Sequence, residues 1–208
     1  KNKLEMAGLP SIEVKSALYN TTKEILIQAG YKTIGLDHFV LPDDELYEAL
    51  ISKKLHRNFQ GYCTRRTTGQ VYAFGITGIS QLATAYSQNT KNLEEYIALV
   101  NKGEFPIKKG YILNEDEQIT RTAISILMCN YSINWQDMAD ELHLSIDRIK
   151  SAINCNDSIL NEFANDEIIE FDEQHITVLP EAAPFVRNVA ASFDKLLGTK
   201  ENRYSKSI

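Results

Sequence analysis

The pattern of expected helices and strands changes near the middle of the 208-residue chain, and this change constrains the fold most. In the first half, apolar periodicity and turn residues predict a helix, a strand and a second helix, a rhythm typical of α/β layers and barrels. A tight turn, Gly75-Ile76-Thr77-Gly78-Ile79-Ser80, then follows a short expected strand. The expected elements of this half are helix 11–29, strand 31–36, helix 42–53, strand 71–75 and helix 92–100.

The second half has a mainly helical pattern, which begins after Gly103-Glu104-Phe105-Pro106. Asn114 with Glu117 three residues later predicts a capping box at a helix start. Three helices, a β-hairpin and a last helix follow, and this order is typical of winged-helix folds. The expected elements are helices from 114, at 134–141 and at 145–163, the hairpin 168–179 and helix 183–197. We therefore expect an α+β protein with two domains, 1–103 and 104–208.

Composition excludes several classes of protein. Hydrophobic residues make up 43% and charged residues 24%, which is ordinary for a water-soluble globular chain. No apolar run approaches the ~20 residues that span a bilayer, so no membrane partner is expected. Cys63, Cys129 and Cys155 lack zinc or iron–sulfur spacing, and we expect reduced thiols of a cytoplasmic protein. The chain begins with Lys1 rather than Met, which suggests a piece of a longer protein.

Charge is divided unevenly along the chain. Residues 49–93 contain no Asp or Glu but six Lys or Arg, whereas residues 134–180 carry a net charge of −9. Segments of opposite sign are expected to meet different partners. The basic stretch also holds amides, aromatic rings and glycines, a mixture suited to a planar ligand that carries carboxylates.

Two functional hypotheses follow from the residues alone. Residues 138–149 look like a helix-turn-helix, which favours a DNA-binding regulator. Such a module needs Lys and Arg near phosphates, and the local charge of −9 repels them. We therefore expect no nucleic-acid partner and favour the second hypothesis, the ligand-binding part of an enzyme.

Several motifs resemble one enzyme family. They are Gly35-Leu36-Asp37-His38-Phe39, Pro42-Asp43-Asp44-Glu45-Leu46, His56-Arg57-Asn58-Phe59-Gln60-Gly61-Tyr62, Gly75-Ile76-Thr77-Gly78-Ile79-Ser80 and Tyr86-Ser87-Gln88-Asn89. Together they resemble the oxygen-independent coproporphyrinogen III oxidases, radical S-adenosylmethionine enzymes of haem synthesis. The family's CxxxCxxC cluster motif is absent, so the chain resembles the carboxyl-terminal half. A related haem-chaperone branch remains an alternative.

The resemblance implies a fold, a reaction and site residues. It implies the last units of a partial (β/α) radical-SAM barrel, then a winged-helix-like cap. The parent would use S-adenosylmethionine and a [4Fe–4S] cluster to convert two propionates of coproporphyrinogen III to vinyls. Residues 1–208 alone would bind neither cofactor, hold no metal and be inactive, and we expect a monomer.

The same resemblance matches three residues to the family's cofactor site: Ile79, Phe59 and Gln60. Alternatively, Ile79 is an ordinary core residue, and Phe59 and Gln60 anchor a loop. On chemical grounds alone, Arg57, Arg65 and Arg66 are candidates for the tetrapyrrole carboxylates, although a solvated loop explains them equally well. No catalytic residue is assigned.

Overall fold

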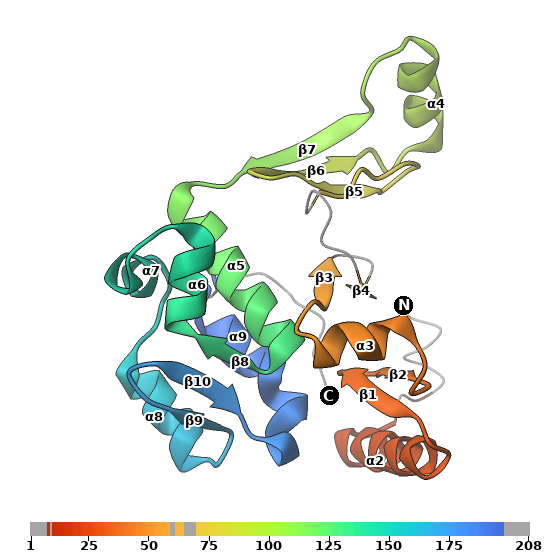
Figure 1. The fold of residues 1–208 in the computed structure, drawn as a ribbon. Helices are drawn as coiled ribbons and strands as arrows, with labels where there is room; N and C mark the ends of the chain where they lie inside the picture. The colour runs from red at the N-terminus through yellow and green to blue at the C-terminus, as the bar shows by residue number, and fades with distance from the viewer. Residues whose placement is uncertain (1–7, 9, 59–60, 65–69, 198–208) are drawn as a thin grey trace.

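The computed structural model describes residues 8, 10–58, 61–64 and 70–197 (Figure 1). The protein is α+β, with small sheets set among helices. The first elements are α2 (Ile12–Gln28), β1 (Lys32–Gly35), β2 (His38–Val40), α3 (Glu45–Ile51), β3 (His56–Asn58), β4 (Gly61–Cys63), β5 (Ile79–Gln81), β6 (Ala85–Asn89) and α4 (Leu93–Asn101). The later elements are β7 (Ile107–Ile112), α5 (Glu115–Asn130), β8 (Ser132–Asn134), α6 (Trp135–Leu142), α7 (Ile146–Ala152), α8 (Asp157–Asn165), β9 (Ile169–Phe171), β10 (His175–Val178), the 3₁₀ helix η1 (Pro180–Phe185) and α9 (Val186–Ser192).

All strand pairs in the described residues are antiparallel. They form the sheets β1-β2, β3-β4, β5-β6-β7 and β8-β10-β9. The expected strand 31–36 ends at Gly35 because the chain reverses there, with Leu36 at φ +49°, and returns as β2. The family resemblance implies units of a (β/α) barrel in residues 1–103, but the parallel strand pairs of such a barrel are not formed among the described strands.

Local capping signals explain where the helices begin. The Ser11 side chain accepts a hydrogen bond from the backbone N–H of Val14, and Asp44 does the same for Leu46. Asn114 and Glu117 form both hydrogen bonds of the expected capping box, which starts α5. Each contact satisfies an N–H group that the first helical turn leaves without a partner. The predicted starts of α2 and α5 are confirmed, whereas α3 begins at Glu45, three residues later than predicted, because Asp44 caps it.

Several segments differ from the sequence-based expectation. The expected strand 71–75 is not formed, and only Val71 pairs, through an isolated antiparallel bridge to Gln81. The expected helix 183–197 is a 3₁₀ helix, η1, followed by the shorter helix α9, which ends at Ser192. The expected helix 145–163 is two helices, because Ile153 turns extended (ψ 160°) and Asn156 caps a new helix. The stretch Gly103-Glu104-Phe105-Pro106, after which the mainly helical half was expected, leads directly into β7, which pairs with β6. Residues on both sides of position 103 therefore share one sheet.

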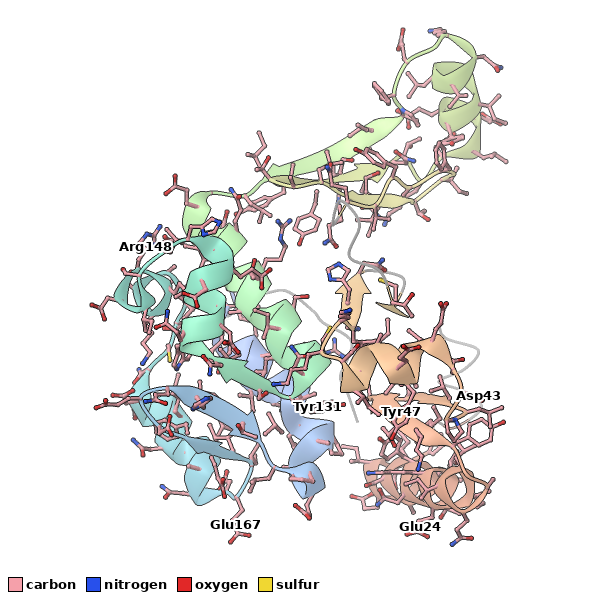
Figure 2. The ribbon with its side chains drawn as sticks, in the orientation of Figure 1. Glu24, Asp43, Tyr47, Tyr131, Arg148 and Glu167 are labelled. Atoms are coloured by element: carbon pink, nitrogen blue, oxygen red, sulfur yellow. The ribbon has the colours of Figure 1, made fainter. Side chains whose placement is uncertain are left out.

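The buried side chains form two clusters. The larger lies among α5–α9 and the sheet β8-β10-β9, with Trp135 and Phe193 among its fully buried side chains. The smaller contains Ile34, Ala49, Leu55 and Cys129. Helix α5 contributes to both clusters, and Tyr131, at its end, lies where they meet (Figure 2).

Apolar side chains are also exposed outside these clusters. Those on α2 are 49–69% exposed, although they recur at helical spacing. The sheet β5-β6-β7 and α4 extend away from the remaining elements (Figure 1), and Ile112 on β7 is 81% exposed. No helix among the described residues is both long enough and apolar enough to cross a bilayer.

Candidate functional site

The turn that precedes Ile79 is held in place by one buried amide. Asn89 is 8% exposed, and its Nδ2 donates to the carbonyl oxygens of Gly75 (2.9 Å) and Ala73 (3.4 Å). The backbone N–H of Asn89 donates to the carbonyl of Gly78 (2.9 Å). A buried amide without hydrogen-bond partners would destabilise the fold, and the turn supplies these partners. In return, the Asn89 hydrogen bonds hold the turn in this conformation.

Two further contacts and two glycines fix the shape of the turn. The N–H of Gly75 donates to Tyr96 Oη (2.9 Å), and that of Thr77 donates to the carbonyl of Thr90 (2.9 Å). Gly75 adopts φ +89°, a left-handed conformation that glycine adopts at low cost. A Cβ on Gly78 would approach the Ala73 Cβ to 3.1 Å and two carbonyl oxygens to 3.2 Å. Glycine is therefore favoured at both positions.

Ile79 is the first residue of β5 and follows this rigid turn directly. It pairs with Gln88 of β6, and its side chain is half-buried rather than part of either buried cluster. Ile79 is therefore not among the fully buried residues of the core. Phe59 and Gln60, the other two residues predicted for the cofactor site, lie outside the described residues.

Arg57 on β3 is partly sequestered within the protein. Its guanidinium lies over the ring of Tyr62 on the paired strand β4, with Cζ 5.7 Å from the ring centroid. The Nε of Arg57 is buried without a hydrogen-bond partner in the described structure. This arrangement differs from a fully solvated loop arginine. Arg65 and Arg66 lie outside the described residues.

A cavity of about 590 Å³ lies between the α3–β3 connection, the β5–β6 turn and helix α5. It contains cationic side chains that sequence reasoning did not bring together. Lys53 and Lys54 come from the acid-free stretch, whereas Arg121 comes from α5. The acid-free stretch, residues 49–93, was the sequence signal for a cationic site. The sequence alone does not show that Arg121, far along the chain, also lines the cavity.

Comparisons with known proteins relate this chain to one group of enzymes. No protein-family model matches it. Along its whole length the chain is 34% identical to the oxygen-independent coproporphyrinogen III oxidase of Synechocystis, over 216 aligned residues. The chain is a relative of the oxygen-independent coproporphyrinogen III oxidases. It spans 45% of the length of that relative.

Other oxidases of this group give the same result. The relative from Thermostichus vulcanus is 34% identical over the whole chain, which spans 63% of that protein. A solved structure of the Escherichia coli coproporphyrinogen III oxidase, described as a radical SAM enzyme, matches 91% of the chain with a TM-score of 0.82 and 33% identity. The chain covers 43% of that structure. The fold is therefore shared over nearly all of the present chain.

The three cysteines are the candidate ligands in this chain for the cluster that radical SAM oxidases use. A [4Fe–4S] cluster needs closely grouped thiolates. Cys129 is 2% exposed, and burial raises its pKa to about 12, so it remains a thiol. Burial also raises the pKa of Cys155. The described residues contain no group of three or more His, Cys, Asp or Glu side chains placed to hold a metal. The cysteines of residues 1–208 thus do not fit such a cluster.

Proposed function

We propose that residues 1–208 work as the carboxyl-terminal part of an oxygen-independent coproporphyrinogen III oxidase. The whole enzyme would remove hydrogen and CO₂ from two propionates of coproporphyrinogen III, leaving the two vinyls of protoporphyrinogen IX. The observation that carries this proposal is the match along the whole chain, in sequence and in fold, to oxidases of this kind. The cluster would be held by residues outside 1–208, and these residues alone are expected to be inactive.

The cofactor-facing residues in this proposal are Ile79, Phe59 and Gln60. In the whole enzyme these residues would hold S-adenosylmethionine, which would supply the radical chemistry for hydrogen abstraction. Ile79 would provide an apolar wall at the end of a rigid turn, and its fixed position supports that role because orientation dominates such reactions. Phe59 and Gln60 would add a ring face and an amide, and Arg57, Arg65 and Arg66 would face substrate carboxylates.

We also propose that residues 114–193 form a winged-helix-like cap and that residues before Asn114 supply the barrel part. The order α5, β8, α6, α7, hairpin β9-β10 supports the first statement. The pairing of β6 with β7 supports a boundary between the two parts at Asn114 rather than at position 103. Further parts of the oxidase would cover the exposed apolar face of α2.

The cap is not a DNA reader in this proposal. Arg148 on α7 forms an ion pair with Asp116 (2.7 Å), and Lys150 lies over the Trp135 ring, 5.3 Å from its centroid. Arg148 lies near the start of α5, where Asp116 is (Figure 2). Both cations of the would-be recognition helix are therefore already engaged, while phosphate binding needs available ones.

Two further properties belong to the proposal. The oxidase would be a monomer of the cytoplasm. No disulfide joins the cysteines in the described part of the chain, which suits a reducing compartment.

The test uses the complete oxidase that contains residues 1–208. Ile79→Ala and Gln60→Ala should each lower the formation of 5′-deoxyadenosine and of protoporphyrinogen IX, by up to about 100-fold, because small displacements of a reacting atom are costly. Ile112→Ala is the matched control, since Ile112 is 81% exposed on β7. Unchanged rates in both site variants would show that these residues are scaffold. An unmodified enzyme that does not convert coproporphyrinogen III would refute the proposed function.

A further inference from the structure

The cavity beside α5 has the lining of an anion-binding site. Its volume is about 590 Å³, enough for a substantial part of a ligand of several rings. Hydroxyl, amide and cationic groups line it from segments far apart in the sequence. The described lining residues are Lys53, Lys54, Leu55, His56, Thr64, Gln81, Ala83, Arg121, Thr122, Ser125, Ile126, Cys129, Asn130 and Glu141.

The charge of this cavity is opposite to that of the chain. Lys53, Lys54 and Arg121 contribute three positive charges and Glu141 one negative charge, whereas the whole chain carries −6. Among the ion pairs between described residues, none involves Lys53, Lys54 or Arg121. Three cations in a concave site attract an anion before contact and hold it after contact.

Arg121 is fixed in place without losing its charge. Its Nη1 donates to the carbonyl of Leu82 (3.1 Å), its Nη2 donates to that of Ala83 (2.5 Å), and its Cζ lies 5.7 Å from the centroid of the Tyr86 ring. Both acceptors are neutral carbonyls, so the guanidinium charge is not compensated. A guanidinium has five N–H donors, and those not engaged here remain for a ligand. A cation already held in one orientation loses little entropy when it binds an oxyanion.

The cavity also lies next to the proposed cofactor site. Gln81 lines it, and Gln81 stands two residues after Ile79 on β5. Side chains two positions apart on a strand point to the same face, roughly 7 Å apart along the strand. A ligand held in the cavity could therefore extend toward the face that carries Ile79.

We propose that this cavity binds propionate carboxylates of the tetrapyrrole, with Lys53, Lys54 and Arg121 as the anchoring cations. The inference rests on the proposed function and extends it, because it assigns substrate-binding residues beyond Arg57, Arg65 and Arg66. Carboxylate and phosphate oxygens share the chemistry that recognises such cations. We take the tetrapyrrole as the ligand that carries these carboxylates. The experiment below distinguishes it from a phosphate ligand.

Coproporphyrin III, the stable tetracarboxylate porphyrin, serves as the binding probe for the complete oxidase that contains residues 1–208, and quenching of its fluorescence measures the dissociation constant. The Lys53→Gln/Lys54→Gln double variant should bind about tenfold more weakly, since each exposed ion pair contributes up to about 1 kcal/mol. The control is Lys91→Gln/Lys102→Gln, which removes the same charge outside the cavity lining and should bind as the unmodified chain does. Arg121→Lys, which keeps the charge but loses the fork, should also weaken binding.

Three results would overturn the proposal. They are equal affinity in both double variants, equal affinity for the tetramethyl ester of the porphyrin, which has no carboxylates, and tighter binding of pyrophosphate than of coproporphyrin III. In the complete oxidase, the Lys53→Gln/Lys54→Gln variant should raise KM for coproporphyrinogen III. If the unmodified oxidase converts coproporphyrinogen III but this variant keeps its KM, the cavity assignment fails and the proposed function stands. If the unmodified oxidase does not convert it, the proposed function fails, and weaker probe binding by the variant would still support a carboxylate site.

Discussion

Tyr62 on β4 donates a hydrogen bond from its Oη to the backbone carbonyl of Met128 on α5, 3.3 Å away and 66 positions along the chain. The same ring lies under the guanidinium of Arg57 and meets His38 edge-on, with ring centroids 5.1 Å apart. One tyrosine thus connects the small cluster around Ile34 with the helix that also contributes to the large cluster.

Any side chain at Gly35 is expected to lower stability, because Gly35 leaves room for this tyrosine. A Cβ at Gly35 would lie 2.2 Å from Tyr62 Oη and 3.2 Å from Tyr131 Oη. Gly35→Ala should therefore lower the free energy of unfolding by about 1–3 kcal/mol, the usual cost of overpacking. Urea unfolding measures the change. Gly110→Ala is the control, because its nearest neighbour would be 3.8 Å away. Equal stability of the two variants would contradict this account.

Asn89→Ala should loosen the turn before Ile79. The substitution removes the donor to the carbonyls of Gly75 and Ala73 and leaves these acceptors without it. An unsatisfied buried group costs about 1–3 kcal/mol, so the amide hydrogens of Thr77 and Gly78 should exchange about tenfold faster or more. Gln88→Ala, which removes a single contact of 3.3 Å from an exposed side chain, should have a smaller effect. Similar exchange in both variants would count against the role of Asn89.

Stability should fall in alkaline solution partly because of Cys129. Burial raises the pKa of this thiol from 9.0 to about 12, so the folded state binds its proton more tightly than the unfolded state does. This contribution is fully present below pH 9 and is lost as the pH rises from 9 toward 12, by at most about 1.4 kcal/mol per pH unit. Between pH 8 and 10, urea unfolding should show a smaller slope for Cys129→Ala than for the unmodified chain.

The control for this pH series is Met128→Ala, which removes a buried side chain that does not titrate. It should lower stability equally at every pH and keep the slope of the unmodified chain. A slope that stays the same in Cys129→Ala would mean that other groups dominate. Burial also raises the pKa values of Tyr62 and Tyr131, which add the same sign of dependence above pH 10.

The 208-residue chain should not retard duplex DNA in gel electrophoresis, even at low salt. Residues 134–180 carry −9, and the two cations of α7 are held by Asp116 and Trp135. Low salt favours any electrostatic binding most strongly, which makes this the most sensitive condition. Micromolar binding that weakens with salt would restore the regulator hypothesis.

The parts of the fold that the sequence predicts best depend on short-range interactions. The starts of α2 and α5 follow from Ser11 and Asn114, because a cap contacts residues only two or three positions away. The break between α7 and α8 had a comparable signal in Asn156, a residue type that favours caps over helix interiors, but apolar periodicity obscured it.

Features that depend on contacts between residues far apart in the chain could not be predicted as well from the sequence. The apolar periodicity of α2 predicts a helix correctly but not whether a partner within the chain covers it. The candidate site shows the same limit. Ile79 is a candidate because of a motif local in the sequence, and its role stays a prediction. The cavity, by contrast, joins Lys54 to Arg121, and no local pattern indicates that pairing.

The clamp of Asn89 on the turn before Ile79 has a consequence for the order of assembly. Its two side-chain contacts close loops of 14 and 16 residues, whereas the contact between Tyr62 and Met128 spans 66. Loop-closure entropy makes the longer contact about 1.4 kcal/mol more costly to form first. The turn that presents Ile79 should therefore take shape early in folding, before the two ends of the long loop meet at α5.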